Sequence, residues 1–113
     1  MGGLAPGPHG RMWLLLTFDV PNETKLQRRN YRRLVQRIRR YGFERIQLSV
    51  YARYVAGGDQ AARFELYLRT HCPPEGEIRI IRLTDEQYQN QVIIRSGRPA
   101  EPEGEPEQYL LFG

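Results

Sequence analysis

The alternation of apolar and polar residues along the chain predicts four strands. The segment 13–18 is continuously apolar and is followed at once by Asp19, which is typical of a central strand covered on both faces. A period of two across 43–55 predicts a second strand. An isoleucine-rich segment at 78–83 predicts a third, and 92–94 predicts a fourth.

The second strand is expected to present two different faces. One face is expected to hold Ile46, Leu48, Val50, Ala52 and Tyr54, and the other Arg45, Gln47, Ser49, Tyr51 and Arg53. Antiparallel sheets often have one solvated side, so the polar face is expected to be wet. An interface or a site on an open sheet face is the alternative.

Two segments have the three- and four-residue spacing of helices. The first is expected to start after Asn22 as its cap, to run to about Tyr41 and to end at Gly42. The second is expected to start at Asp59 and to end before Pro73. Their apolar positions are Tyr31, Leu34, Val35, Ile38 and Tyr41 in the first helix, and Ala61, Phe64 and Leu68 in the second.

We expect an α+β fold of the ferredoxin-like kind, whose order of elements is βαββαβ. In this plan two βαβ halves form a four-stranded antiparallel sheet with both helices on one face. We expect this domain to span residues 12–96. The Gly- and Pro-rich residues 1–11 are expected to be a disordered leader, and 97–113 an acidic linker followed by a docking segment.

Length and composition narrow the class of protein. A chain of 113 residues suits one domain, and its single cysteine, Cys72, excludes an intrachain disulfide and a Cys-rich zinc site. Neither His9 nor His71 has a partner at metal-ligand spacing. The longest apolar run is far shorter than the roughly 20 residues of a membrane span. We therefore expect a cytoplasmic protein with no membrane partner.

The charge is distributed unevenly along the chain. The formal net charge is +4, from 17 basic and 13 acidic residues, but the last four acids all follow Arg98. Residues 1–98 therefore carry a net charge of +8. A basic folded part favours an anionic partner such as nucleic acid.

The first helix is the strongest sign of that partner. Residues 25–40 hold eight bases, seven of them arginines, and no acid, whereas a solvated helix usually mixes both signs. Arg28 and Arg29 lie near the positive end of the helix dipole, where free N–H groups and guanidinium groups together attract phosphate. We expect salt-dependent binding of the nucleic-acid backbone without sequence preference. The residues expected to bind it are Arg28, Arg29, Arg32, Arg33 and Arg45.

Asp19 is the candidate for chemistry. An aspartate between a strand and a helix often serves only as a turn or cap residue. The alternative is a carboxylate that holds Mg²⁺ for phosphodiester hydrolysis. One carboxylate per chain is a small ligand set, but a twofold dimer would place two copies of Asp19 across its axis if the interface runs beside this strand end.

The motifs around these residues form a family pattern. They are Thr17-Phe18-Asp19-Val20-Pro21, Thr24-Lys25, Arg28-Arg29-x-Tyr31, Gly42-Phe43 and Arg45-Ile46-Gln47-x-Ser49-Val50-Tyr51. Together they resemble the CRISPR-associated endoribonuclease family, the small dimeric subunit that accompanies the CRISPR integrase during spacer acquisition. The likeness covers about residues 12–96.

The resemblance implies a ferredoxin-like homodimer in which Asp19 from both chains flanks one Mg²⁺ ion and is the catalytic residue. It also implies that Arg28 or Arg29 and Arg45 lie near that site, with Ser49 and Tyr51 on the adjoining strand. Many members carry Phe where this chain has Tyr51.

Two activities follow from the resemblance. Some members are metal-dependent nucleases on single-stranded RNA or on duplex DNA, and others act as a scaffold that bridges two integrase dimers. A Mg²⁺-dependent endonuclease and a noncatalytic DNA-binding scaffold are therefore both open. An RNA-binding module of the same topology and a toxin-type ribonuclease are more distant alternatives.

The end of the chain predicts a further contact. The apolar residues Tyr109, Leu110, Leu111 and Phe112 follow an acidic linker and are typical of a docking peptide. In the family this segment packs on the neighbouring protomer and contacts the integrase. The peptide is also similar to those that dock on bacterial sliding clamps, which makes a clamp a second expected partner.

Overall fold

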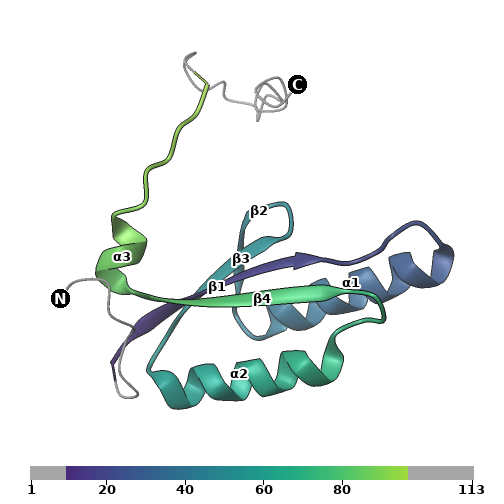
Figure 1. Cartoon of the computed structure of the whole chain (residues 1–113), viewed down its shortest axis with the longest axis horizontal. Helices are drawn as coiled ribbons and strands as arrows, with labels where there is room; N and C mark the ends of the chain where they lie inside the picture. Colours follow the sequence, from purple (N-terminus) through teal and green to yellow (C-terminus); the bar gives the residue numbers. More distant parts are fainter. Residues whose placement is uncertain (1–9, 97–113) are drawn as a thin grey trace.

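The computed structural model describes residues 10–96, which form one antiparallel sheet and three helices (Figure 1). In chain order the elements are β1 (Met12–Asp19), α1 (Lys25–Arg40), β2 (Glu44–Gln47), β3 (Val50–Val55), α2 (Gly58–His71), β4 (Glu77–Thr84) and α3 (Asp85–Gln89). The α+β, ferredoxin-like fold is confirmed. The expected leader, acidic linker and docking peptide lie largely outside the described residues.

The four strands lie in the order β2-β3-β1-β4, so the first strand of the sequence is central in the sheet. Both neighbours of β1 run antiparallel to it, and Leu16 lies opposite Tyr51 of β3 and Ile80 of β4. The end of β1 lies beside the start of β4, where Asp19 is opposite Glu77. This register places the two carboxylates at one end of the sheet.

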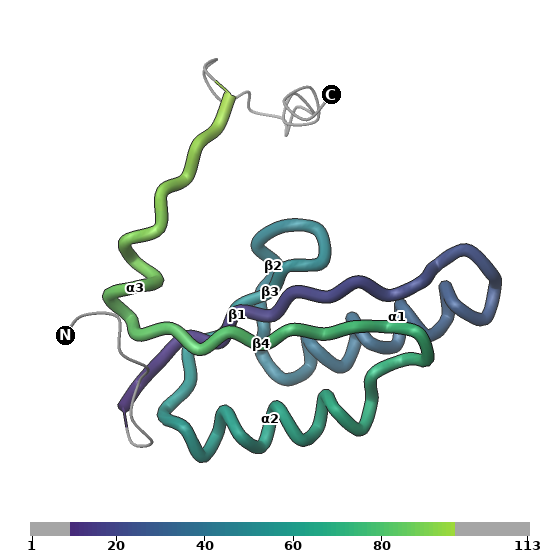
Figure 2. The backbone as a smooth tube through the Cα atoms, viewed as in Figure 1, coloured from purple at the N-terminus to yellow at the C-terminus, as the bar shows by residue number. Residues whose placement is uncertain are grey.

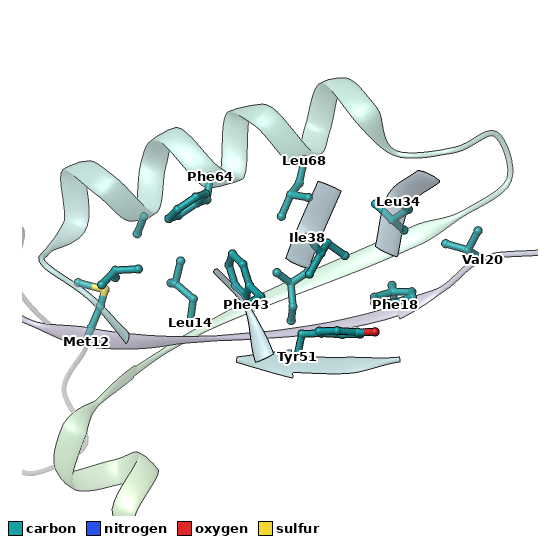
Figure 3. Close-up of a cluster of buried hydrophobic side chains, with 13 residues drawn as sticks. Met12, Leu14, Phe18, Val20, Leu34, Ile38, Phe43, Tyr51, Phe64 and Leu68 are labelled. Carbon is teal, nitrogen blue, oxygen red and sulfur yellow. The ribbon is translucent and has the colours of Figure 1, made fainter. Parts of the chain in front are cut away.

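Helices α1 and α2 cover the same face of the sheet, and the hydrophobic core fills the space between them and the strands (Figures 2 and 3). Leu14 and Leu16 of β1 are completely buried, and Leu34 and Ile38 of α1 are almost so. The expected apolar residues of both helices face this core, except Tyr41, which is partly exposed at the end of α1. The core therefore follows directly from the apolar periodicity.

The opposite face of the sheet carries no long helix. Its residues on β1 are Trp13, Leu15, Thr17 and Asp19. Val50, Ala52 and Tyr54 lie opposite them on β3, and Glu77, Arg79, Ile81 and Leu83 on β4. Among the helices within residues 10–96, the short helix α3 contacts one end of this face, where Tyr88 stacks on Trp13 with ring centroids 3.9 Å apart. We call these residues the open face.

The continuous strand expected at 43–55 is wrong, because the chain turns at Leu48 and Ser49 to form the hairpin of β2 and β3. Ser49 has a φ of 64°, in the left-handed region that permits the reversal. The turn changes which residues face the core. Tyr51 is 4% exposed and buried, whereas Leu48 is 73% exposed. The expected polar face of this segment therefore does not exist as one surface.

The strand expected at 92–94 is also absent from the described part of the chain. Val92, Ile93 and Ile94 follow α3 as an extended segment that leads away from the sheet, and each is more than half exposed (Figure 1). The fourth strand comes from the hairpin instead. The ferredoxin-like fold class was thus correct, although the strand segments predicted at 43–55 and 92–94 were not: two strands, β2 and β3, lie between α1 and α2, and one, β4, follows α2.

The helix ends differ in detail from the prediction. Thr24, not Asn22, caps α1, since its hydroxyl accepts the backbone N–H of Gln27 while the Gln27 side chain accepts the N–H of Thr24. Gly42 ends the helix with a φ of 88°, as expected. Helix α2 begins after Gly57, and Asp59 lies in its first turn rather than at its cap.

None of the helices within residues 10–96 is long and apolar enough to cross a membrane.

Candidate functional site

Asp19 is the last residue of β1 and its side chain is exposed on the open face. The residues on either side of it, Phe18 and Val20, are both buried, with 7% and 6% exposure. Burial on both sides fixes the backbone at this point. The carboxylate is therefore exposed to solvent on a rigid backbone. A carboxylate held in this way is better suited to binding a ligand or to catalysis than one on a mobile turn.

Two hydrogen bonds join this strand end to the hairpin and to α1. The backbone N–H of Phe18 donates to the carbonyl of Ser49 over 3.1 Å. The hydroxyl groups of Ser49 and Tyr31 lie 3.2 Å apart, and both residues are partly buried. The edge of the Tyr31 ring also packs on Phe18, with centroids 5.9 Å apart. Ser49 is thus next to the candidate site, as expected, and it lies in the turn rather than on a strand.

Tyr31 is a residue that the sequence assigned only to the apolar stripe of its helix. The stripe does place it in the core cluster, where it packs against buried residues. Its hydroxyl contact with Ser49 depends on the hairpin, which the periodicity concealed. No signal along the chain connects the two residues.

Tyr51 supports the site from beneath and does not line it. Its ring stacks on Phe18 with centroids 5.8 Å apart and an interplanar angle of 22°, inside the core. The expectation that it lies on the polar strand face beside Asp19 is wrong. Because an aromatic ring fills this position, Tyr51 retains the packing that a Phe would give.

Glu77 is the nearest acidic residue to Asp19 in the sheet register and was not predicted. The two residues are directly opposite each other on β4 and β1, at a separation where side chains on one face interact. The Glu77 carboxylate also lies 3.5 Å from the guanidinium of Arg79. Within residues 10–96 no three metal-binding side chains come together. One chain alone therefore offers an incomplete metal site.

Seven of the eight basic residues of α1 are exposed and Arg37 is partly buried, and they have few partners within residues 10–96. Arg28 donates from Nη1 to the carbonyl of Glu23 over 2.6 Å, and this bond holds the loop between β1 and the helix. In the part of the chain that the structure describes, both salt bridges involve β4, and none involves α1. The expected ligand-binding residues Arg28, Arg29, Arg32 and Arg33 are all exposed. Their positive charge is therefore available to an external anion.

Arg45 is exposed on the outer strand β2, opposite Tyr51. Two strand spacings separate β2 from β1, or about 10 Å across the sheet. The structure therefore places Arg45 apart from Asp19 within one chain. It can contact an extended ligand, but it is not a neighbour of the carboxylate.

The family model described as "CRISPR associated protein Cas2" matches residues 12–91, which include the whole sheet, Asp19 and all of α1. The chain belongs to the CRISPR associated protein Cas2 family. The resemblance seen in the motifs around Asp19 and α1 is thereby confirmed. The Cas2 match ends two residues after α3 and does not extend to the acidic linker or the terminal apolar peptide.

Relatives of this Cas2 chain cover most of its length. A protein of Lacticaseibacillus rhamnosus is 39% identical over 70% of this chain and 78% of its own. One from Parvibaculum lavamentivorans is 30% identical over 89% of this chain and all of its own, and one from Flavobacterium psychrophilum is 28% identical over 89% and 88%. All three are named CRISPR-associated endoribonuclease Cas2.

Proposed function

We propose that this chain is a Mg²⁺-dependent endoribonuclease that acts as a homodimer in CRISPR spacer acquisition. One observation carries the proposal: Asp19 presents an exposed carboxylate from a rigid strand end, in the same chain as a helix whose arginines form no salt bridge within residues 10–96. A carboxylate beside a phosphate-binding surface is the minimum that metal-assisted phosphodiester hydrolysis requires. The names of the relatives support the same activity.

The composition of the open face supports the homodimer. An antiparallel sheet with a solvated side is expected to be polar there, yet this side carries a run of apolar residues. They are Leu15, Val50, Ala52, Ile81 and Leu83, accompanied by Trp13 and Tyr54. Ile81 is 42% exposed and lies directly opposite Leu15. A second copy packed on this face would cover these residues and bring the two Asp19 side chains toward one another.

The donor atoms of Asp19 suit Mg²⁺, which binds carboxylate oxygens and retains several of its waters. Two Asp19 carboxylates, one from each protomer, would hold the ion, and Glu77 lies opposite each of them in the sheet. When bound, Mg²⁺ supplies Lewis-acid stabilisation and an activated water.

The side chains of this protein bind and orient the substrate. The guanidinium groups of Arg28, Arg29 and Arg32 make two-point contacts with backbone phosphates and so fix the position of the strand. Buried Phe18 and Val20 prevent movement of Asp19 as the substrate binds. No base-reading motif accompanies these groups, so binding is independent of sequence.

The proposed partners are single-stranded RNA or duplex DNA, the CRISPR integrase and a second copy of the chain. A noncatalytic scaffold that holds duplex DNA between integrase dimers is the second candidate function. It is favoured by the basic side chains of α1, which form no salt bridge within residues 10–96, and by the small number of metal-binding side chains at the site in one chain. A sliding clamp is a further proposed partner of Tyr109, Leu110, Leu111 and Phe112, which lie outside the described residues.

Replacing Asp19 with Asn separates the two candidate functions. We expect Asp19→Asn to abolish Mg²⁺-dependent cleavage of single-stranded RNA and duplex DNA while leaving the fold and the binding of nucleic acid intact. Asp59→Asn removes an equally exposed negative charge from the start of α2 and is the matched control. Cleavage that persists in Asp19→Asn would refute the nuclease. Spacer acquisition that remains normal while cleavage is lost would assign the biological role to the scaffold.

The arginine surface is tested through the salt dependence of binding. The triple change of Arg28, Arg29 and Arg32 to Gln should reduce the slope of log K against log salt by roughly one per arginine. The control is the same change at Arg63, Arg69 and Arg95, which are exposed elsewhere. Equal slopes in the two triple variants would show that α1 does not bind the backbone.

The dimer is tested with a charge on the open face. Ile81→Asp should convert the dimer to monomers in light-scattering measurements, because the carboxylate would be buried without a partner. Leu66→Asp, on the outer side of α2 and 63% exposed, is the control. A dimer that survives Ile81→Asp would place the interface elsewhere.

A further inference from the structure

A pocket of about 200 Å³ lies between α1 and the C-terminal end of α2. Three residues of α1 line one side of it, namely Asn30, Arg33 and Arg37, and residues 70–74 line the other. Positions three and four apart share one stripe of a helix, so these three side chains project in one direction. Among the arginine positions discussed above, only Arg33 belongs to this stripe.

The charge of the pocket is positive. Arg33, Arg37 and His71 are its basic residues, and no Asp or Glu lines it. Neither guanidinium forms a salt bridge or a side-chain hydrogen bond within residues 10–96. The carbonyl groups that end α2 carry about half a negative charge, which two guanidinium groups exceed. An anion that enters the pocket is therefore attracted to it.

The wall contributed by α2 is ordered before any ligand arrives. The Nδ1–H of His71 donates to the carbonyl of Tyr67 over 2.8 Å, and the imidazole packs on the Tyr67 ring with centroids 4.2 Å apart. The hydroxyl of Thr70 likewise donates to the carbonyl of Leu66. Both donors on this wall are therefore used within the protein, and the donors for a phosphate oxygen come from α1. Little side-chain freedom is lost here on binding.

The turn that follows the pocket residues of α2 packs against the Asp19 strand end. The turn after α2 closes with a hydrogen bond of 3.0 Å from the N–H of Gly76 to the carbonyl of Pro73. Gly76 is so close to Val20 that a Cβ added to it would lie 3.1 Å from the Val20 Cγ2. Val20 follows Asp19 directly, which places the pocket and the carboxylate at the same end of the molecule.

We propose that this pocket binds a backbone phosphate of the nucleic-acid strand that extends to Asp19. Paired guanidinium groups match the two-point geometry of a phosphate, and the amide of Asn30 adds a neutral donor of the kind that commonly contacts phosphate oxygens. The pocket would hold a phosphate remote from the cleaved bond and so fix the register of the strand. The proposal rests on the proposed nucleic-acid function and adds Asn30 and Arg37 to the binding surface.

Titration of the full chain with inorganic phosphate at constant ionic strength tests the pocket itself. We expect saturable shifts of the backbone amide NMR signals of Thr70 and His71, and loss of saturation when Arg33 and Arg37 are both changed to Gln. The double change of Arg39 and Arg40 to Gln removes the same charge from α1 outside the pocket and should preserve saturation. Absence of saturable shifts in the unaltered chain would overturn the proposal.

Binding of a fluorescent single-stranded RNA distinguishes a polynucleotide phosphate from a free one. The Arg33 and Arg37 double variant should bind at least tenfold more weakly than the Arg39 and Arg40 variant at low salt, and its cleavage products should change in length. Equal affinities and products would overturn the polynucleotide assignment, even if free phosphate still binds. Persistent cleavage in Asp19→Asn would refute the catalytic proposal but would leave the phosphate titration unchanged, so the two failures are separable.

Discussion

The hydroxyl contact between Tyr31 and Ser49 offers a direct measure of how firmly the Asp19 strand end is held. The two hydroxyl oxygens are 3.2 Å apart, which is long for a hydrogen bond between hydroxyl groups. Both residues are only partly buried, so water can reach the hydroxyl that remains when the other is removed. We therefore expect Tyr31→Phe and Ser49→Ala each to reduce the free energy of unfolding by about 1 kcal/mol. The double variant should lose about as much as either single one.

Urea denaturation of all four proteins gives the coupling energy between the two hydroxyl groups, which we expect to be about 0.5–1 kcal/mol. In thermal unfolding each single change should lower the midpoint by about 4–8 °C for a domain of this size. Tyr67→Phe is the control, because the Tyr67 hydroxyl has no hydrogen-bond partner among residues 10–96. A coupling energy near zero would refute a direct bond. A loss in Tyr67→Phe equal to that in Tyr31→Phe would attribute the effect to removal of a tyrosine hydroxyl in general and not to its contact with Ser49.

Three further predictions concern the core, a turn and the short helix. Leu16→Ala should reduce the free energy of unfolding by about 2–5 kcal/mol, and Leu48→Ala, at the exposed hairpin tip, by less than about 0.5 kcal/mol, as measured by urea denaturation. Gly42→Ala should cost about 1–2 kcal/mol in the same assay, because a φ of 88° disfavours any residue with a Cβ. The indole N–H of Trp13 donates to Asp85 and is the first cause that lowers the pKa of this carboxyl, followed by a hydrogen bond from a nearby amide. The ionised Asp85 carboxylate should therefore hold its hydrogen bond to Trp13 above the ordinary aspartate pKa of about 3.9, and this contribution should be lost as the pH falls through the lower pKa of the folded state. The fluorescence of the single tryptophan will report the change, and Asp85→Asn should remove it.

Much of the fold could be predicted because the decisive signals are local. The continuous apolar run of β1, the acid-free helix α1 and the terminating Gly42 each lie within a few consecutive residues. Asp19 was predicted for the same reason, since it ends an apolar run. The hairpin was missed because Leu48 is not a typical turn residue, Ser49 is a weaker turn signal than Gly or Asn, and a regular alternation continues through both.

The remaining features of the site depend on pairing between distant segments. Glu77 becomes a neighbour of Asp19 only through the register of β1 and β4, which are separated by two helices and a hairpin. Tyr31 contacts Ser49 only after the hairpin has formed. The pocket requires α1 and the end of α2 to lie side by side. Spacing along the chain contains none of this information.

The central position of β1 also dictates the order in which the sheet can be completed. The strand is made first during synthesis, yet it pairs with β3 only after a helix and β2 have followed, and with β4 only after a second helix has been added. Until then one edge of β1 has no partner strand, and the apolar residues of β1 are not yet covered by α2. Because each of these pairings closes a long loop, the domain should fold more slowly than a helical bundle of equal length. A nascent chain stalled before β4 would expose one unpaired edge of the central strand, so the risk of aggregation is greatest just before translation of the domain is complete.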